Sequence, residues 1–239
     1  MLTPPPHRVL AIGDIHGCAT ALSALLDAVR LAAGDELVIL GDAVDRGPDS
    51  RGVINQLLDL SERLPVQFVL GNHEQMLLDS IDGRMPRQEW LGFGGAETLD
   101  SYKDGAGEDA IPARHVEFIR SWGDYHETSS HFFAHGNYVA KLPLDQQRWQ
   151  HLRWISLKQQ TPAVHCSGKT AVLGHTSNKK GEIVNLGHLI CIDTYCHGGG
   201  WLTALDTVTG GVWQANNQGE SRQIELPPIR AKKVLGWWG

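Results

Sequence analysis

The sequence lacks long apolar runs, CxxC pairs and an excess of positive charge, and each absence excludes a class of protein. Its runs of Val, Ile and Leu, such as residues 37–40, are far shorter than the roughly 20 residues of a membrane-spanning helix. Four cysteines without CxxC spacing in 239 residues indicate neither a zinc knuckle nor a disulfide scaffold, so we expect free thiols. With 21 Lys and Arg against 27 Asp and Glu, the net charge of -6 argues against a nucleic-acid polymer as partner.

The ends of the chain carry few signals. The opening MLTPPPH has no basic segment followed by an apolar one, so we expect no secretory signal, no membrane partner and a cytoplasmic protein. Without a linker or repeat, we expect a single domain over residues 1–239, with a variable excursion at about 83–127 and a tail from about 227. We expect Trp237 and Trp238 in that tail to dock on the core, with folding over the cleft as the alternative.

Short apolar runs alternate with helical patterns in the first third of the chain. The predicted strands are Val9–Ile12, Leu37–Leu40 and Val66–Leu70. Leucine, isoleucine and valine recur at helical spacing between them, within residues 22–29 and 53–58. This β-α-β-α-β order predicts a parallel sheet covered by helices, whose ligands gather at the carboxyl ends of the strands.

The middle and last parts of the chain have a different pattern. Residues 83–127 are irregular and polar, with helical pieces at 86–90 and 114–122, which is typical of a surface excursion or cap. Strand-like runs with glycine turns then return at His131–Ala134, Thr170–Leu173, Leu189–Ile192, Trp201–Leu205 and Gly211–Gln214. Their close spacing favours a second, more antiparallel sheet half.

Five short polar clusters each follow a predicted strand, beginning at residues 13, 41, 71, 134 and 174. A Gly-Asp or Gly-His pair alone is usually a turn, but five in order predict side chains that converge on one rim. The converging residues are Asp14, His16, Asp42, Asn72, His135 and His175. Because imidazole, carboxylate and amide oxygen together suit Mn, Fe or Zn, we expect a site for two divalent metal ions, Mn in vitro with Fe or Zn as alternatives.

The neighbouring residues suggest hydrolysis of a phosphate ester. Asp42, at the end of the central strand, is the natural bridge between two metals, which together produce a bridging hydroxide for in-line attack on phosphorus. The forked guanidinium of Arg46 suits two phosphoryl oxygens. His73 follows Asn72 directly and is expected to protonate the leaving oxygen, with Asp45 orienting it.

These motifs resemble the metal-dependent phosphoprotein phosphatase family, especially its short phage and bacterial members, over about residues 8–215. The family signatures GDxHG, GDxVDRG and GNHE appear here as GDIHG, GDAVDRG and GNHE, and residues 94–99 look like its GGxxTL stretch. The resemblance implies an α/β fold of the calcineurin-like metallophosphoesterase type, an αββα sandwich of two mixed sheets. It also implies one metal on Asp14, His16 and Asp42, and another on Asp42, Asn72, His135 and His175. Arg46, Asn72 and His73 would contact the substrate, and His73, Asp45 and Arg46 would be catalytic.

Two departures from the family concern the rim of the site. Short members usually have an arginine where this chain has Ser156, so a second phosphate clamp is missing unless Arg153 replaces it. Related chains have a small residue where this one has Tyr195, and we expect that tyrosine to be packed rather than open to the cleft.

Three functions follow from this interpretation. The resemblance favours a serine/threonine protein phosphatase, a hydrolase whose partner is a phosphorylated protein or another phosphoester substrate. The alternative is hydrolysis of diadenosine tetraphosphate or related capped nucleotides, which relatives with the same metal site cleave. The third is a catalytically weak protein that binds a phosphorylated partner, against which the intact His73 and Arg46 argue.

Overall fold

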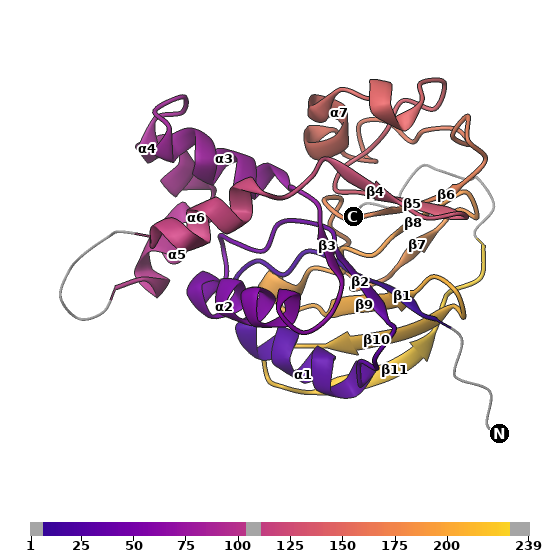
Figure 1. Cartoon of the computed structure of the whole chain (residues 1–239), viewed down its shortest axis with the longest axis horizontal. Helices are drawn as coiled ribbons and strands as arrows, with labels where there is room; N and C mark the ends of the chain where they lie inside the picture. The colour runs from indigo at the N-terminus through magenta and orange to yellow at the C-terminus, as the bar shows by residue number, and fades with distance from the viewer. Residues whose placement is uncertain (1–6, 104–110, 230–239) are drawn as a thin grey trace.

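Two packed sheets form the centre of the molecule (Figure 1). The computed structural model describes residues 7–103 and 111–229. One sheet has the strand order β11-β10-β9-β1-β2-β3 and the other β4-β5-β6-β8-β7. The strands are β1 (Val9–Ile12), β2 (Glu36–Ile39), β3 (Val66–Phe68), β4 (Tyr125–Glu127), β5 (His131–Ala134), β6 (Thr170–Leu173), β7 (Val184–Asn185), β8 (Leu189–Cys191), β9 (Leu202–Asp206), β10 (Gly211–Ala215) and β11 (Ser221–Glu225).

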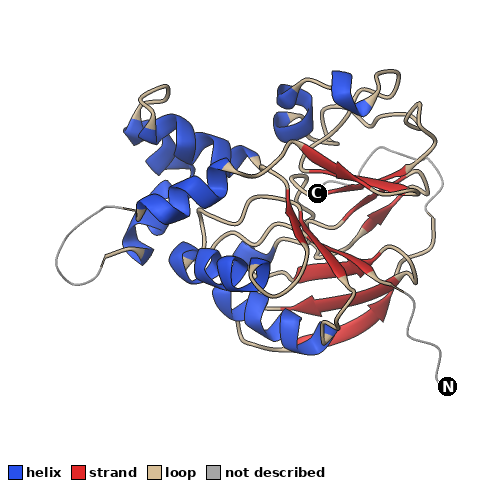
Figure 2. Cartoon of the chain, viewed as in Figure 1, coloured by secondary structure: helices blue, strands red, loops and turns tan. Residues whose placement is uncertain are grey.

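Helices cover the outer faces of this pair of sheets (Figure 2). The helical elements are α1 (Ala19–Val29), α2 (Ser50–Ser61), α3 (Asn72–Ile81), α4 (Arg87–Trp90), η1 (Leu91–Gly95), α5 (Ala96–Ser101), α6 (Ala113–Arg120), η2 (Leu144–Gln146), α7 (Trp149–Trp154) and η3 (Cys196–Gly198). Helix α1 packs on β9, β10 and α2. The predicted fold class, two mixed sheets flanked by helices, is therefore confirmed.

The apolar strands are buried on both faces, which explains why they read as continuous runs rather than as alternating ones. In β1, Leu10 and Ile12 belong to the core beneath α1 and α2, whereas Val9 and Ala11 pack between the sheets. A third core lies on the outer face of the second sheet, where Phe132 and Ala134 meet Leu152 of α7. Apolar cores between the sheets and on both outer faces therefore hold the strands whose ends form a shared rim.

The expectation of a more antiparallel second half is wrong in its topology. Strands β5, β6 and β8 pair in parallel and form the second sheet. Strands β9 and β10 instead pair antiparallel and join the first sheet beside β1. Glycine-rich turns and short spacing do not distinguish a hairpin that stays in one sheet from a chain that crosses to another.

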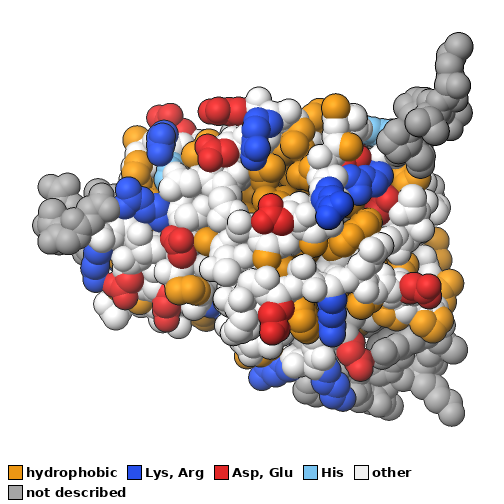
Figure 3. Space-filling model, turned by 90° about the horizontal axis from the view of Figure 1, so that it is seen from below, with side chains coloured by type: hydrophobic (Ala, Val, Ile, Leu, Met, Phe, Trp, Pro, Cys, Tyr) orange, Lys and Arg blue, Asp and Glu red, His pale blue; other side chains and the backbone are white. Residues whose placement is uncertain are grey.

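The segment between α3 and β4 confirms the two predicted helical pieces, which are α4 and α6. Trp237 and Trp238 lie outside the described residues, so their docking stays a prediction. In the described part of the chain, no helix is both long enough and apolar enough to cross a bilayer. On the face shown in Figure 3, acidic and basic side chains are interspersed.

Candidate metal centre

The predicted ligands come from both sheets and meet at the shared rim. Asp14 and His16 follow β1, Asp42 follows β2, Asn72 begins α3 after β3, His135 follows β5 and His175 follows β6. All six are buried or partly buried. The carboxyl ends of five parallel strands therefore place these side chains together, as expected from the strand pattern.

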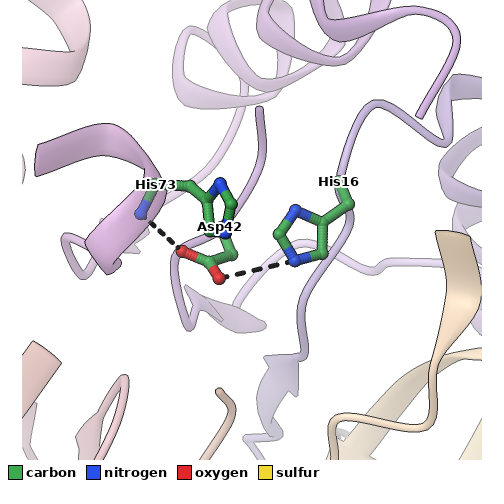
Figure 4. Close-up of side chains that lie close together, drawn as sticks. All are labelled: His16, Asp42 and His73. Atoms are coloured by element: carbon green, nitrogen blue, oxygen red, sulfur yellow. Dashed lines mark hydrogen bonds and ion pairs between the residues drawn. The ribbon is translucent and has the colours of Figure 1, made fainter. Parts of the chain in front are cut away.

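Asp42 is at the centre of this group. Its Oδ1 lies 3.3 Å from Nε2 of His135, and its Oδ2 lies 3.4 Å from Nε2 of His16. The backbone N–H of His73 donates to Oδ1 at 3.0 Å, so the carboxylate sits at the positive N-terminus of α3 (Figure 4). Burial raises the pKa of Asp42, but the imidazoles of His135 and His73 outweigh burial and hold it well below its usual range.

The amide oxygen of Asn72 joins two further imidazoles. Its Oδ1 lies 3.0 Å from Nε2 of His135 and 2.9 Å from Nδ1 of His175. Burial, together with the charge of His135, lowers the pKa of His175 to about 4. A neutral imidazole is the form that binds a metal ion, so this environment suits a ligand.

Backbone carbonyls fix the orientation of the other rings. Nδ1 of His135 lies 2.7 Å from the carbonyl oxygen of Leu40, and Nδ1 of His16 lies 2.9 Å from that of Val44. With Nδ1 occupied, each ring presents Nε2 to Asp42. Such outer contacts are typical of histidines that bind metal ions.

Asp14 contacts the loop that carries His175. Its carboxylate accepts the backbone N–H of His175 at 3.1 and 3.0 Å, and a Cβ on Gly174 would lie only 2.2 Å from its Oδ1. Burial, and then the nearby carboxylate of Asp193, raise the pKa of Asp14 well above its usual range. Sequence reasoning assigned no role to Asp193, which is itself buried.

The donor set fits two divalent cations. The ligand atoms of His16, Asp42 and His73 lie within 4.8 Å of one another, as do those of Asp42, His135 and His175. Asp42 belongs to both groups, in agreement with a bridging position. The buried carboxylates of Asp14, Asp42 and Asp193 would repel one another without compensating positive charge. Asp14 belongs to neither group, so its role as a ligand stays a prediction, and so does the division of the ligands between two metals.

Strained backbone concentrates at this centre. Seven non-glycine residues in the described part of the chain have positive φ: His16, Arg30, Asp42, Asp45, Arg46, His175 and Tyr195. Five of them are residues that the sequence singled out for the site. Such conformations persist only where the surrounding structure enforces them, which is typical of functional sites.

Glu74 holds the Asp42 turn in this conformation. Its carboxylate accepts backbone N–H groups from Asp42 at 2.8 Å, Ala43 at 2.7 Å and Gly71 at 3.0 Å. Burial, and then the charge of Asp42, raise the pKa of Glu74 to about 7. The GNHE motif contained this residue, but sequence reasoning gave it no role.

The predicted acid and its orienting carboxylate are in contact. Nδ1 of His73 lies 2.8 Å from Oδ2 of Asp45, and both side chains are buried. Nε1 of Trp90 donates to the same oxygen at 3.0 Å, and the Thr98 hydroxyl donates to Oδ1 at 2.7 Å. The excursion therefore supports the site through Trp90 and Thr98. Sequence reasoning missed both roles, although Thr98 lies in the GGxxTL stretch.

Arg46 lies beside the metal ligands, whereas Arg153 does not. Nη1 of Arg46 is 3.2 Å from Nε2 of His16, and its backbone N–H donates to the carbonyl of Gly94 at 3.0 Å. The guanidinium of Arg153 instead binds Asp124 and Gln75. Arg153 is thus committed to other partners and does not replace the arginine that is absent at Ser156.

The loop after β8 places Tyr195 and His197 at the rim. The Tyr195 ring packs over Gly198, where an added Cβ would lie 2.0 Å from its Cζ. This supports the interpretation of a packed tyrosine. The His197 ring contacts both Tyr195, at a centroid distance of 4.9 Å, and His16, at 4.7 Å. Sequence reasoning assigned no role to His197.

Comparisons with known proteins agree with this geometry. A family model described as "Calcineurin-like phosphoesterase" matches residues 7–208. "Serine/threonine-protein phosphatase 1" of Salmonella typhimurium is 34% identical over 163 residues, which cover 63% of this chain and 71% of that protein. "Bis(5'-nucleosyl)-tetraphosphatase, symmetrical" of Ralstonia nicotianae is 46% identical over 74 residues, which cover 31% of this chain but only 24% of that protein.

A solved structure has a similar fold over nearly the whole chain. It is described as "Crystal structure of a putative diadenosine tetraphosphatase", with a TM-score of 0.66 and 23% identity. The match covers 94% of this chain and 96% of that one. At this level of identity the likeness shows the fold alone.

Proposed function

Since the chain belongs to the calcineurin-like phosphoesterase family, we propose that it is a binuclear-metal phosphatase that hydrolyses phosphoserine and phosphothreonine esters in proteins. The coarser statement, a metal-dependent phosphoester hydrolase, follows from the family itself. The observation that carries the proposal is the buried His73–Asp45 pair beside Asp42 and Arg46.

The metal ions would be held by the six predicted ligands at the rim. Asp42 would be shared between them, because it belongs to both groups of ligand atoms. When bound, two divalent cations activate water as the nucleophile and offset charge on phosphoryl oxygens. The side chains of the protein would bind the phosphoryl group and transfer the proton. Arg46 binds two oxygens of the phosphoryl group, and His73 donates a proton to the serine or threonine oxygen that leaves. Asp45 keeps Nδ1 of His73 protonated and the ring in place.

Two observations support a protein substrate. The Salmonella protein phosphatase aligns with this chain over 71% of its own length. In addition, Arg153 is bound to Asp124 and Gln75 and adds no positive charge for a long polyphosphate. A phosphomonoester has one phosphoryl group, which Arg46 and the cations would contact.

Hydrolysis of diadenosine tetraphosphate is the second candidate. It is favoured by the local identity of 46% over 74 residues to the Ralstonia tetraphosphatase. That match covers only 24% of the relative, so it supports the nucleotide hydrolase less than a match over most of the protein would. A binding protein without turnover is disfavoured because His73 and Asp45 are in hydrogen-bond contact.

The test compares initial rates on a phosphothreonine peptide and on diadenosine tetraphosphate. Metal-stripped protein is assayed with Mn²⁺ and with a chelator, next to the His73→Asn variant as a catalytic control. We expect Mn²⁺-dependent release of phosphate from the peptide, well above nucleotide cleavage. The reverse ratio would establish the nucleotide hydrolase, and no Mn²⁺-dependent turnover of either substrate would favour a binding role.

A further inference from the structure

His197 borders the same imidazole as two residues of the proposed reaction. The ring of His16 makes edge contacts with the rings of His73 and of His197, each at a centroid distance of 4.7 Å. Nη1 of Arg46 lies 3.2 Å from Nε2 of His16. The acid, the phosphate-binding arginine and His197 therefore surround one predicted metal ligand.

The His197 ring has hydrogen-bonding capacity that the described residues leave unused. Its Nδ1 is buried and has no hydrogen-bond partner among them. Buried polar atoms nearly always have a partner, so an orphan nitrogen beside a metal centre indicates a group that a ligand completes. The Tyr195 ring packs against His197 and holds it next to His16.

One phosphoryl contact is missing from the residues assigned so far. The phosphoryl group of a monoester has three non-bridging oxygens, and the fork of Arg46 can bind two of them. Ser156 offers no guanidinium, and Arg153 is bound to Asp124 and Gln75. A donor near Arg46 would fill this gap, and an imidazole N–H is such a donor.

We propose that His197 is a further substrate-binding residue, whose imidazole N–H donates a hydrogen bond to a phosphoryl oxygen held next to Arg46. Its ligand is a tetrahedral phosphoryl group, in a phosphoester or in the inorganic phosphate product. The inference rests on the proposed function, because it assumes that Arg46 binds the phosphoryl group.

The test measures binding of inorganic phosphate to the Mn²⁺-loaded protein by titration calorimetry. His197→Leu keeps an apolar contact with His16 but removes the donor, whereas His197→Asn keeps a donor close to the position of Nδ1. His131→Leu, at the opposite end of β5 from His135, is the matched control. Metal content is measured on every variant, and KM and kcat are measured on a phosphothreonine peptide.

We expect His197→Leu to weaken phosphate binding roughly 10-fold, as for loss of one hydrogen bond to a charged group. KM should rise with it while kcat changes little, metal content should stay at the wild-type level, and His197→Asn should regain most of the affinity. Phosphate affinity equal to that of the wild type in His197→Leu would overturn the proposal. So would equal losses in both variants, or loss of metal together with phosphate, because these indicate that His197 only packs against His16. A wild-type protein without Mn²⁺-dependent turnover of the peptide would overturn the proposed function itself, whatever the variants bind.

Discussion

Nδ1 of His73 lies 2.8 Å from Oδ2 of Asp45, and this carboxylate also accepts hydrogen bonds from Trp90 and Thr98. With three donors around it, the Asp45 side chain cannot rotate to another partner. The contact fixes the His73 ring and, in the proposed reaction, leaves its second nitrogen, Nε2, for the leaving group. In that proposal the excursion as well as the motif positions the acid.

Replacement of His73 by asparagine tests the acid. We expect His73→Asn to lower kcat by roughly 10²- to 10⁴-fold, as for removal of a general acid, with metal content nearly unchanged. Steady-state rates and elemental analysis check the two parts. Unaltered turnover would remove His73 from the mechanism, whereas loss of metal would make it a ligand, since its ring lies within 4.8 Å of ligand atoms of His16 and Asp42.

Replacement of Asp42 by asparagine tests the bridge. Asparagine tolerates the left-handed backbone of this position, where φ is 50°, so the fold should survive. We expect Asp42→Asn to lose both metal ions together, because both groups of ligands share this carboxylate. Elemental analysis after dialysis gives the stoichiometry. Two full equivalents of retained metal would contradict the bridging assignment.

The fold could be predicted where periodicity is strong. Strands β1 and β5 lie on the predicted residues. A short apolar run bounded by turn residues is typical of a buried strand, so the pattern was sufficient here. The pairing of β9 with β1 could not be predicted, because strand order depends on long-range packing that short sequence patterns do not record. Short or polar strands such as β7 and β11 gave no usable signal.

The site could be predicted wherever a motif fixes both residue type and strand end. His135 and His175 were found in this way, and the structure places both next to Asn72. The supporting residues could not be found, because Trp90 and Thr98 reach Asp45 from 45 and 53 positions away along the chain. Nothing in the local sequence distinguishes Trp90 from an ordinary buried residue, and the GGxxTL stretch that contains Thr98 does not indicate its partner.

Thr98 offers a test of this outer support. Thr98→Val keeps the shape of the side chain but removes the hydroxyl that donates to Asp45 at 2.7 Å and accepts its backbone N–H at 2.9 Å. We expect the free energy of unfolding to fall by about 1–3 kcal/mol and kcat to fall by roughly 10- to 100-fold. Urea unfolding and steady-state rates measure these. Thr170→Val, at the opposite end of β6 from His175, is the control, and an equal loss of kcat there would contradict a specific role for Thr98.

Asp35, outside the metal centre, gives the protein a pH-dependent contribution to stability. Nε of Arg8 donates to its Oδ1 at 3.0 Å, and the backbone N–H of Ala32 donates to its Oδ2 at 2.7 Å. Burial raises the pKa of Asp35, but these hydrogen bonds outweigh burial and lower it below the ordinary value of 3.8. Because the folded pKa lies below the unfolded one, the stabilisation is complete above the unfolded value and is lost as the pH falls through the folded value.

The comparison of wild type with Asp35→Asn isolates this contribution. Above about pH 5 we expect the variant to be less stable by about 1–3 kcal/mol, because Arg8 loses its charged partner. Below about pH 4 the difference should shrink, since Asp35 of the unfolded wild-type chain is protonated first and that of the folded protein only at still lower pH. Urea unfolding of both proteins between pH 7 and pH 3 measures it. A difference that stays constant or grows at acid pH would show that the Arg8–Asp35 contact depends on shape rather than on the carboxylate charge.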